Sequence, residues 1–366
     1  MTAIADIFRT YGPAYLHLHG EAVPQSHRKV IQAIIHCRTQ AYGTALYQCE
    51  KCHQTHSVFR SCGNRHCPTC QGHKTLQWLH RHLKEQLPGH HFLITFTVPE
   101  ELRPFIRSNQ RLGYSALFKA SSYAIKRLAA DSRYVGGDLP GFFGVLHTWG
   151  RQLHFHPHIH YLAPGGAFST QDRRWHPSRL DFYLPVHALS KIFKAKFKQE
   201  MHKAGRLPDI PPQVWSQSWN VNVQPLGNAT DQTIHYLATY VFKVAISNSR
   251  IVSSERGRVT FRYKKPHSAR PRSVCLDVME FIRRFLHHVL PTGFMKVRYF
   301  GFFNPTSPVS LEHISDLIQL QYGFNLACPA PDLPPPPTLF CPNCGGQLLY
   351  CYAVLPSSQP TFMNTG

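Results

Sequence analysis

The ten residues from Leu153 to Leu162, Leu-His-Phe-His-Pro-His-Ile-His-Tyr-Leu, place a histidine at every second position from 154 to 160. Successive side chains of a β-strand point to opposite faces, so an extended stretch would present all four imidazoles on one side. Alternate residues lie about 6–7 Å apart along a strand, so one metal ion can bind two neighbouring histidines of the row. Pro157 cannot donate a ladder hydrogen bond, which favours His158 and His160 as that pair. The alternative interpretation is an exposed polar strand face without a metal.

The composition is that of a globular and strongly basic protein. Hydrophobic residues make up 43% of the 366 residues and charged residues only 16%, which excludes a disordered tail. Lysine and arginine number 40 against 19 acidic residues, a net charge of +21, which indicates a polyanionic partner. We find no apolar run long enough to span a bilayer and no secretory signal in the first twenty residues. We therefore expect a nucleic-acid partner, no membrane and a cytoplasmic location.

The chain mixes strand-like and helix-like segments, and neighbouring strands are joined by short turns. The stretches 142–149 and 153–162 flank Gly150 and predict a hairpin or an adjacent pair. Such a mixture predicts an α+β fold, an antiparallel sheet with packed helices. Further strands are predicted at 91–98, 219–223, 259–263 and 297–302, and helices at 73–87, 102–130, 189–204, 231–246 and 274–289.

Cysteines gather near the start of the chain in a pattern typical of a zinc ribbon. Cys49-x-x-Cys52 and Cys67-x-x-Cys70 are separated by about fourteen residues, close to the spacing of paired zinc knuckles. Two such turns supply the four ligands of a tetrahedral structural zinc. Three candidates remain for a second zinc, although the two cysteines among them could instead be small buried side chains: Cys37, Cys62 and His66.

A further knuckle lies near the end of the chain, after a proline-rich stretch. Cys341-Pro-Asn-Cys344 is half of a zinc ribbon. Cys328 and Cys351 could supply the other two ligands, or the pair could remain without a metal.

The segment 235–245 carries a second chemical signal. At about 100° per residue on a helix, Tyr236, Tyr240 and Lys243 fall within a narrow arc that is distinct from the apolar stripe. Beside a metal-bound phosphate, a phenol can attack phosphorus and form a covalent ester. Lys243 would offset negative charge in the transition state. The alternative is a pair of half-buried tyrosines whose hydroxyls reach water.

The residues that follow are basic, with two aromatic residues, Phe261 and Tyr263, interleaved. Stacking aromatics and cations together form a platform for single-stranded nucleic acid, whereas a solvated basic hairpin is the alternative. The candidate DNA-binding residues are Arg250, Arg258, Arg262, Lys264 and Lys265.

Six motifs together resemble the HUH superfamily of single-strand nucleases. Within it, the chain is most similar to the bacterial rolling-circle transposases of the insertion sequence ninety-one (IS91) family, of the two-tyrosine type. The matching stretches are 61–70 (Ser-Cys-Gly-Asn-Arg-His-Cys-Pro-Thr-Cys), 147–149 (His-Thr-Trp), 156–160 (His-Pro-His-Ile-His), 236–240 (Tyr-Leu-Ala-Thr-Tyr), 245–250 and 281–291.

This resemblance implies a metal-dependent transesterase that acts on single-stranded DNA at transposon ends. His158 and His160 would bind Mg²⁺ or Mn²⁺ together with a third ligand, for which His156 is our choice. Tyr236 and Tyr240 would be the nucleophiles, forming a 5′-phosphotyrosine and a free 3′-hydroxyl. The third ligand stays open at this point, the other candidates being His154, His147 and Gln232.

The resemblance also implies a division into consecutive domains. We expect a zinc-binding domain at 1–75, an HUH nuclease domain at 76–265, its helix and strand extension at 266–327, and a linker with the last cysteines at 328–366. Three other functions compete with the transposase: a replication initiator or relaxase with the same chemistry, a zinc metallohydrolase, and a non-catalytic zinc-ribbon DNA-binding protein.

Overall fold

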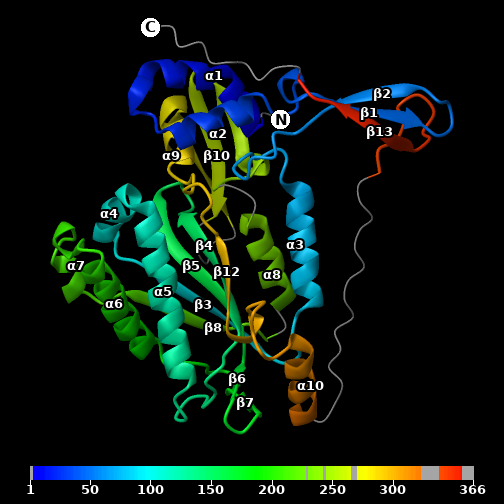
Figure 1. Ribbon diagram of the computed structural model, residues 1–366. Coiled ribbons are helices and arrows are strands. Elements are labelled where there is room, and N and C mark those ends of the chain that lie inside the picture. The colour runs from blue at the N-terminus through cyan, green and yellow to red at the C-terminus, as the bar shows by residue number, and fades with distance from the viewer. Residues whose placement is uncertain (1–2, 228–229, 242–244, 265–269, 323–337, 357–366) are drawn as a thin grey trace. The chain divides into compact units, whose positions relative to one another are not determined.

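The computed structural model describes residues 3–227, 230–241, 245–264, 270–322 and 338–356 (Figure 1). They group into two compact units, here called terminal and central. The terminal unit comprises Met1–Leu76, Phe242–Val289 and Asp332–Gly366, and the central unit Gln77–Val241 and Leu290–Pro331. This grouping differs from the four consecutive segments expected above, because it follows contacts and not chain order. No described helix combines the length and the apolarity that crossing a bilayer requires.

The central unit is built on a five-stranded sheet in the order β12-β4-β5-β3-β8, and every neighbouring pair is antiparallel. The predicted α+β class with an antiparallel sheet is therefore confirmed. Stretches 142–149 and 153–162 pair directly, as expected from the short turn between them. The strands are β3 (His91–Thr97), β4 (Phe142–Trp149), β5 (Phe155–Pro164), β8 (Asn220–Pro225) and β12 (Val297–Phe300).

The two faces of this sheet carry different residues because side chains alternate along β5. Ile159 and Tyr161 point into the main core, where the Tyr161 hydroxyl lies 2.7 Å from Ser121 Oγ of α5 (Gln110–Ala129). The even-numbered histidines of β5 therefore face the opposite side. On that side Leu162 lines a small cavity together with Ile234 of α8 (Thr230–Val241).

The remaining elements of the central unit include one correction. The helix predicted at 102–130 is two helices, α4 (Arg103–Ser108) and α5, because Asn109 leaves the helical conformation between them. A small hairpin and a late helix were not predicted. The other elements are α3 (Gly72–Lys84), which begins before the unit boundary, α6 (Val186–Lys203), α7 (Gln213–Ser216), α10 (Leu311–Tyr322), β6 (Gly166–Phe168) and β7 (Trp175–Pro177).

The terminal unit holds a second antiparallel sheet, β11-β10-β9, packed against α9 (Val278–Leu286). Phe261 of β10 contacts Phe281 of α9, and Phe285 of α9 contacts Phe8 of α1 at a ring-centroid distance of 5.0 Å. The elements are α1 (Ile4–His19), α2 (Gln25–Ile35), β9 (Ile251–Glu255), β10 (Arg258–Lys264) and β11 (Pro271–Asp277).

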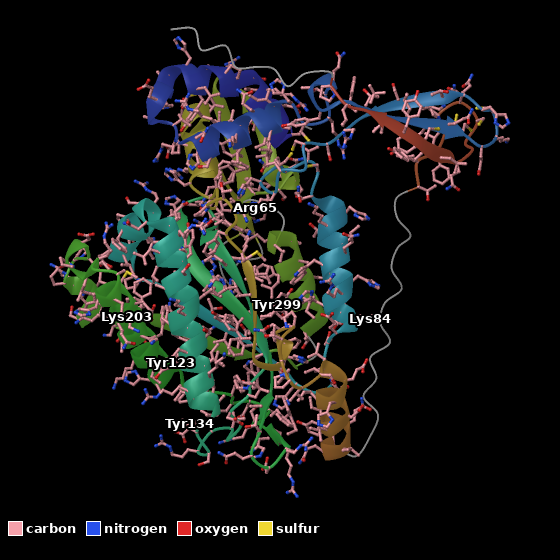
Figure 2. The ribbon with its side chains drawn as sticks, viewed as in Figure 1. Arg65, Lys84, Tyr123, Tyr134, Lys203 and Tyr299 are labelled. Carbon is pink, nitrogen blue, oxygen red and sulfur yellow. The ribbon has the colours of Figure 1, made fainter. Side chains whose placement is uncertain are left out.

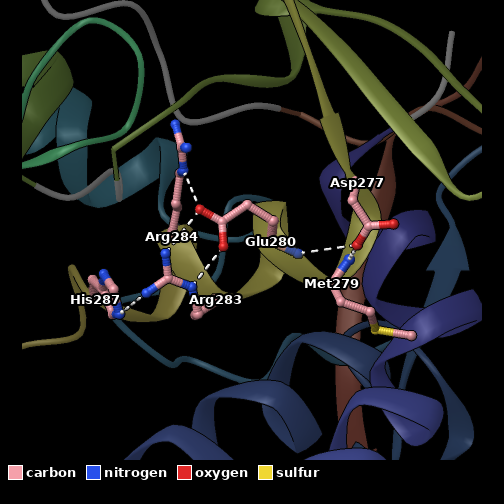
Figure 3. Close-up of polar contacts among 6 residues, drawn as sticks. All are labelled: Asp277, Met279, Glu280, Arg283, Arg284 and His287. Atoms are coloured by element: carbon pink, nitrogen blue, oxygen red, sulfur yellow. Dashed lines mark hydrogen bonds and ion pairs between the residues drawn. The ribbon is translucent and has the colours of Figure 1, made fainter.

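The helix predicted at 274–289 is wrong in its first four residues, where the chain forms the end of β11. Partly buried and exposed positions alternate there with a period of two. The helix starts only at Asp277, whose carboxylate accepts hydrogen bonds from the backbone N–H groups of Met279 and Glu280 (Figure 3). Glu280 then pairs with Arg283 and Arg284, and these bonds lower the pKa of its carboxyl to about 2.

A third sheet joins the two ends of the chain. β1 (Thr44–Cys49) lies between β2 (Thr55–Phe59) and β13 (Leu348–Val354), and both pairings are antiparallel. We call this three-stranded sheet and its cysteines the ribbon. It places the last cysteine pair, Cys341 and Cys344, beside Cys49 and Cys52. From the sequence, these two pairs were expected in separate segments.

Candidate active site and metal centres

Three histidines, His147, His158 and His160, form a group on the even-numbered face of the central sheet. Their ligand nitrogens all lie within 4.8 Å of one another, so one metal ion can contact all three. His147 stands directly opposite His158 in the β4–β5 pairing. Directly paired residues of neighbouring strands have Cβ atoms about 4.5–5.5 Å apart, closer than alternate residues of one strand. The third member of the group therefore comes from the neighbouring strand.

His156, our choice for the third ligand, is not a member of this group. The β4–β5 pairing shifts register between His147 and Trp149, so the strand is irregular at the start of β5. His154 lies before the strand and is exposed, so the four imidazoles do not form one continuous row. The sequence named His147 only as one of several candidates, because its pairing with His158 depends on the register between β4 and β5.

The two β5 histidines that belong to the group, His158 and His160, are oriented by bonds at Nδ1. His158 Nδ1 lies 2.7 Å from the backbone carbonyl oxygen of His156, which can only accept, so this nitrogen carries the proton. His160 Nδ1 lies 2.9 Å from Thr95 Oγ1 of β3. Outer-shell bonds of this kind fix the ring and leave Nε2 for a metal. His156 thus contributes a backbone atom that positions a ligand.

Burial keeps these imidazoles neutral. It lowers the pKa of His147 and His158 well below 6.5, and neighbouring groups, mainly His160, lower both further. Burial and the nearby His156 lower the pKa of His160 to about 4. The neutral ring is the form that binds metal, so the group fits a divalent cation at neutral pH.

Tyr236 of α8 lies beside the histidine group. Its ring centroid is 6.3 Å from that of His147 and 6.2 Å from that of His160, and 45% of the residue is exposed. Leu237 and Ala238 of the same helix are buried, so α8 packs through one face and leaves Tyr236 accessible. Tyr240 also belongs to α8, but its side chain lies outside the described residues, as does Lys243.

The cysteines form two tetrads that differ from the predicted one. Cys49 and Cys52 do not share a group with Cys67 and Cys70. They meet the last pair of the chain, with Cys49 Sγ 3.4 Å from Cys344 Sγ and Cys52 Sγ 3.7 Å from Cys341 Sγ. The pairing of β1 with β13 brings them together. The two tetrads, each with all sulfurs within 4.8 Å, are Cys49, Cys52, Cys341 and Cys344, and Cys37, Cys62, Cys67 and Cys70.

The second tetrad corrects the assignment of His66. Cys37 occupies the fourth position, and His66 is not part of the group. His66 Nε2 instead accepts a hydrogen bond of 3.3 Å from Arg65 Nε. Cys37 and Cys62, for which burial alone was the alternative, have the positions of zinc ligands.

The ribbon tetrad has features typical of a zinc knuckle. The backbone N–H of Cys52 donates to Cys49 Sγ and lowers the pKa of Cys49 to about 6, which favours the thiolate that binds metal. A Cβ added at Gly346 would lie 2.9 Å from Cys49 Sγ, so only glycine fits beside the sulfurs. Cys351 is exposed and not a member, and Cys328 lies outside the described residues.

The candidate DNA-binding residues lie along one strand of the terminal unit. Arg258, Arg262 and Lys264 of β10 are exposed and alternate with inward residues. Arg250 Nε donates to the backbone carbonyl of Arg262, so its guanidinium stays against the same sheet. Lys265 lies outside the described residues.

Phe261 cannot stack on a base as the sequence suggested. It is fully buried between β10 and α9, where it contacts Phe281. The alternation of β10 explains this, because the basic residues occupy one face and the aromatic residue the other. Tyr263 is partly buried on the same strand.

Comparison with known proteins agrees with this arrangement. A family model described as "Putative transposase" matches residues 141–310, which include the histidine group and α8, and a model described as "Transposase zinc-binding domain" matches residues 7–98. No solved structure matches the chain.

Two curated proteins are similar over most of their length. "Putative transposase y4qJ" of Sinorhizobium fredii is 38% identical over 318 residues, covering 82% of this chain and 79% of the relative. "Transposase for insertion sequence element IS801" of Pseudomonas savastanoi pv. phaseolicola is 26% identical over 305 residues, covering 75% and 69%. With a zinc-binding domain, two cysteine tetrads suited to structural zinc and these relatives, the chain belongs to the IS91 family of transposases.

Proposed function

We propose that this transposase nicks and rejoins single-stranded DNA by metal-dependent transesterification, through a 5′-phosphotyrosine, in rolling-circle transposition. The observation that carries the proposal is the Tyr236 ring, 6.3 Å from His147 and 6.2 Å from His160 between centroids. A nucleophile and a group of metal ligands must lie this close to act on one phosphate.

The histidine group would hold Mg²⁺ or Mn²⁺ through His147, His158 and His160. A bound divalent cation polarises a phosphoryl oxygen and offsets the charge that develops during displacement. Neutral imidazoles leave the charge of such a cation uncompensated by the protein, and three ligands leave positions for the oxygen ligands that these ions prefer.

Tyr236 would supply the attacking oxygen. The phenol gives its proton to water, its oxygen forms a bond to phosphorus, and the bond between phosphorus and the 3′ oxygen breaks. The released 3′ oxygen takes up a proton. One phosphodiester is exchanged for one phosphotyrosine ester, so a 3′-hydroxyl can later reverse the reaction without ATP. Tyr240, on the same helix, would serve a second strand in the same way.

The substrate would be single-stranded DNA at the transposon ends, in the bacterial cytoplasm. The net charge of +21 and the basic face of β10 support a nucleic-acid substrate. A single strand suits this reaction because its phosphates are accessible to the exposed Tyr236, whose phenolic oxygen attacks one of them.

The test uses single-stranded oligonucleotides that tile the DNA flanking the coding sequence, with Mn²⁺ and a denaturing gel. A 5′-phosphotyrosine keeps a 3′ label on the protein and releases a 5′-labelled fragment ending in a 3′-hydroxyl. We expect this label asymmetry from the wild type and its loss from the double variant Tyr236→Phe, Tyr240→Phe.

Tyr123→Phe is the matched control. Tyr123 lies on α5 (Figure 2), the helix that packs on the core face of the sheet opposite the histidines, and is 40% exposed, close to the exposure of Tyr236. It should form adduct like the wild type. Adduct from the double variant would refute the tyrosine assignment, and DNA binding by the wild type without any adduct would favour a non-catalytic DNA-binding protein.

A further inference from the structure

Lys296 is fixed beside the histidine group by its backbone. It stands immediately before β12, and its carbonyl oxygen accepts a 3.0 Å hydrogen bond from the backbone N–H of Leu146. Leu146 directly precedes His147 in β4. The lysine is therefore held at the edge of the sheet next to the strand that supplies one metal ligand.

Its side chain continues toward the site over an aromatic ring. Lys296 Nζ lies 4.6 Å from the centroid of the Trp149 ring. Trp149 in turn stacks on His147, with ring centroids 5.1 Å apart and planes at 13°. These two contacts place an ammonium group within one nucleotide's reach of the histidine group.

Lys296 brings a positive charge close to the histidine group. Its ammonium group lies over the Trp149 ring, and that ring stacks on His147. An ammonium group beside a divalent cation bound at the histidines is unfavourable in the absence of DNA, because like charges repel. A polyanion that bridges both would remove this repulsion.

We propose that Lys296 is a phosphate-binding residue that contacts the phosphodiester next to the one held at the histidine group. The assignment rests on the proposed function, since it takes the scissile phosphate to lie at His147, His158 and His160. The Trp149 ring holds the butyl stem and presents the ammonium, which is a compact charge suited to phosphate oxygens.

The test compares Lys296→Met with Lys126→Met. Lys126, on α5, also lies over an aromatic ring, with Nζ 5.7 Å from the centroid of Phe300. Phe300 packs on the main core, the face opposite the histidines. Each variant therefore removes one charge and one cation–π contact from the central unit, but only one of them acts beside the site.

Binding of a single-stranded oligonucleotide is measured in EDTA at several salt concentrations, so the readout needs neither metal nor cleavage. Loss of one phosphate contact lowers the slope of log K against log salt by about 0.7 for a single strand. We expect this decrease for Lys296→Met, none for Lys126→Met, and recovery of the wild-type slope in Lys296→Arg. The thermal midpoint should fall by similar amounts in both methionine variants.

Equal slopes for Lys296→Met and Lys126→Met would overturn the proposal. A lowered thermal midpoint for Lys296→Met with an unchanged slope would also overturn it, because the lysine would then only pack on Trp149. Failure of the proposed function is a separate result: wild-type protein would form no adduct with Mn²⁺, whatever the slopes. An adduct from the wild type with equal slopes leaves the proposed function intact and refutes only Lys296.

Discussion

His147 and His158 face each other across β4 and β5, with ring centroids 5.3 Å apart and planes at 81°. Their strands pair antiparallel through a short turn, so the two rings belong to one hairpin and are positioned by its register. A register shift of one residue would move either histidine to the core face. The metal-binding geometry therefore depends on the hairpin as much as on the histidine motif itself.

The first prediction separates His147 from His156 as ligands. His147→Ala should weaken Mn²⁺ binding by more than the roughly 10–100-fold that loss of an outer-shell partner costs. His156→Ala should leave affinity nearly unchanged, because that residue contributes its backbone carbonyl to His158. Electron paramagnetic resonance of free Mn²⁺ measures both. Equal losses in the two variants would restore His156 as a ligand.

The second prediction concerns the outer shell. Thr95→Val removes the hydroxyl 2.9 Å from His160 Nδ1 while keeping the side-chain shape. We expect a 10–100-fold loss of Mn²⁺ affinity, since the ring loses its orienting bond. Thr97→Val, two residues along the same strand, is the control and should bind normally. Unaltered affinity in Thr95→Val would show that the hydroxyl does not orient the ring.

The third prediction follows the zinc ligands. Cys344→Ser should remove the zinc of the ribbon and leave that of the other tetrad, so the content measured by plasma mass spectrometry falls from two ions to one. Cys67→Ser should remove the other ion. Cys351→Ser, on an exposed residue outside both tetrads, should retain two. Retention of both ions in Cys344→Ser would mean that the zinc ligands all lie within the first 75 residues, as the sequence predicted.

The fourth prediction is a loss of stability in acid. Burial lowers the pKa of both His82 and His91 to about 4, below the ordinary 6.5 expected in the unfolded chain. As the pH falls below 6.5, these two imidazoles bind protons in the unfolded chain but stay neutral in the folded protein. Each histidine therefore destabilises the fold progressively between pH 6.5 and 4, by up to about 3 kcal/mol.

Urea denaturation in EDTA, at pH values from 8 to 4.5, tests this. The double variant His82→Gln, His91→Gln should lose less stability over that range than the wild type, although it starts lower because it loses the hydrogen bond between His82 and the Tyr299 hydroxyl. Above pH 7 the two curves should run parallel. Parallel curves throughout would mean that neither ring resists protonation.

The fifth prediction concerns the basic face of β10. Arg262→Gln and Lys264→Gln should each weaken DNA binding to a similar extent for all sequences and lower the salt slope by about 0.7. Arg133→Gln is the control, since that arginine is already paired with Asp131. A change that depends on DNA sequence would indicate base contacts in place of phosphate contacts.

Local patterns were sufficient for much of the fold. β-Branched and aromatic residues predicted β3, and the strands predicted at 142–149 and 219–223 lie close to the observed β4 and β8. The turn at Gly150 predicted the pairing of β4 with β5. The segment from 274 failed because its apolar residues fit a strand and a helix alike, and the capping carboxylate of Asp277 decides where the helix begins.

The sites show where such patterns end. Cysteines are chemically equivalent, so spacing cannot say which knuckle meets which. The decision lies in the pairing of β1 with β13, which joins residues nearly three hundred positions apart. The identity of the third histidine likewise depends on strand register. The helical arc of Tyr236 and the histidine motif could both be recognised from the sequence, because each is a local pattern.

The ribbon also sets the order in which the protein can mature on the ribosome. Cys49 and Cys52 emerge nearly three hundred residues before their partners Cys341 and Cys344. Domains generally fold as they emerge, from the N-terminus onward. The early half-site must therefore stay as open thiols until Cys344 has been made, and any chain that ends before Cys341 leaves the site unable to close.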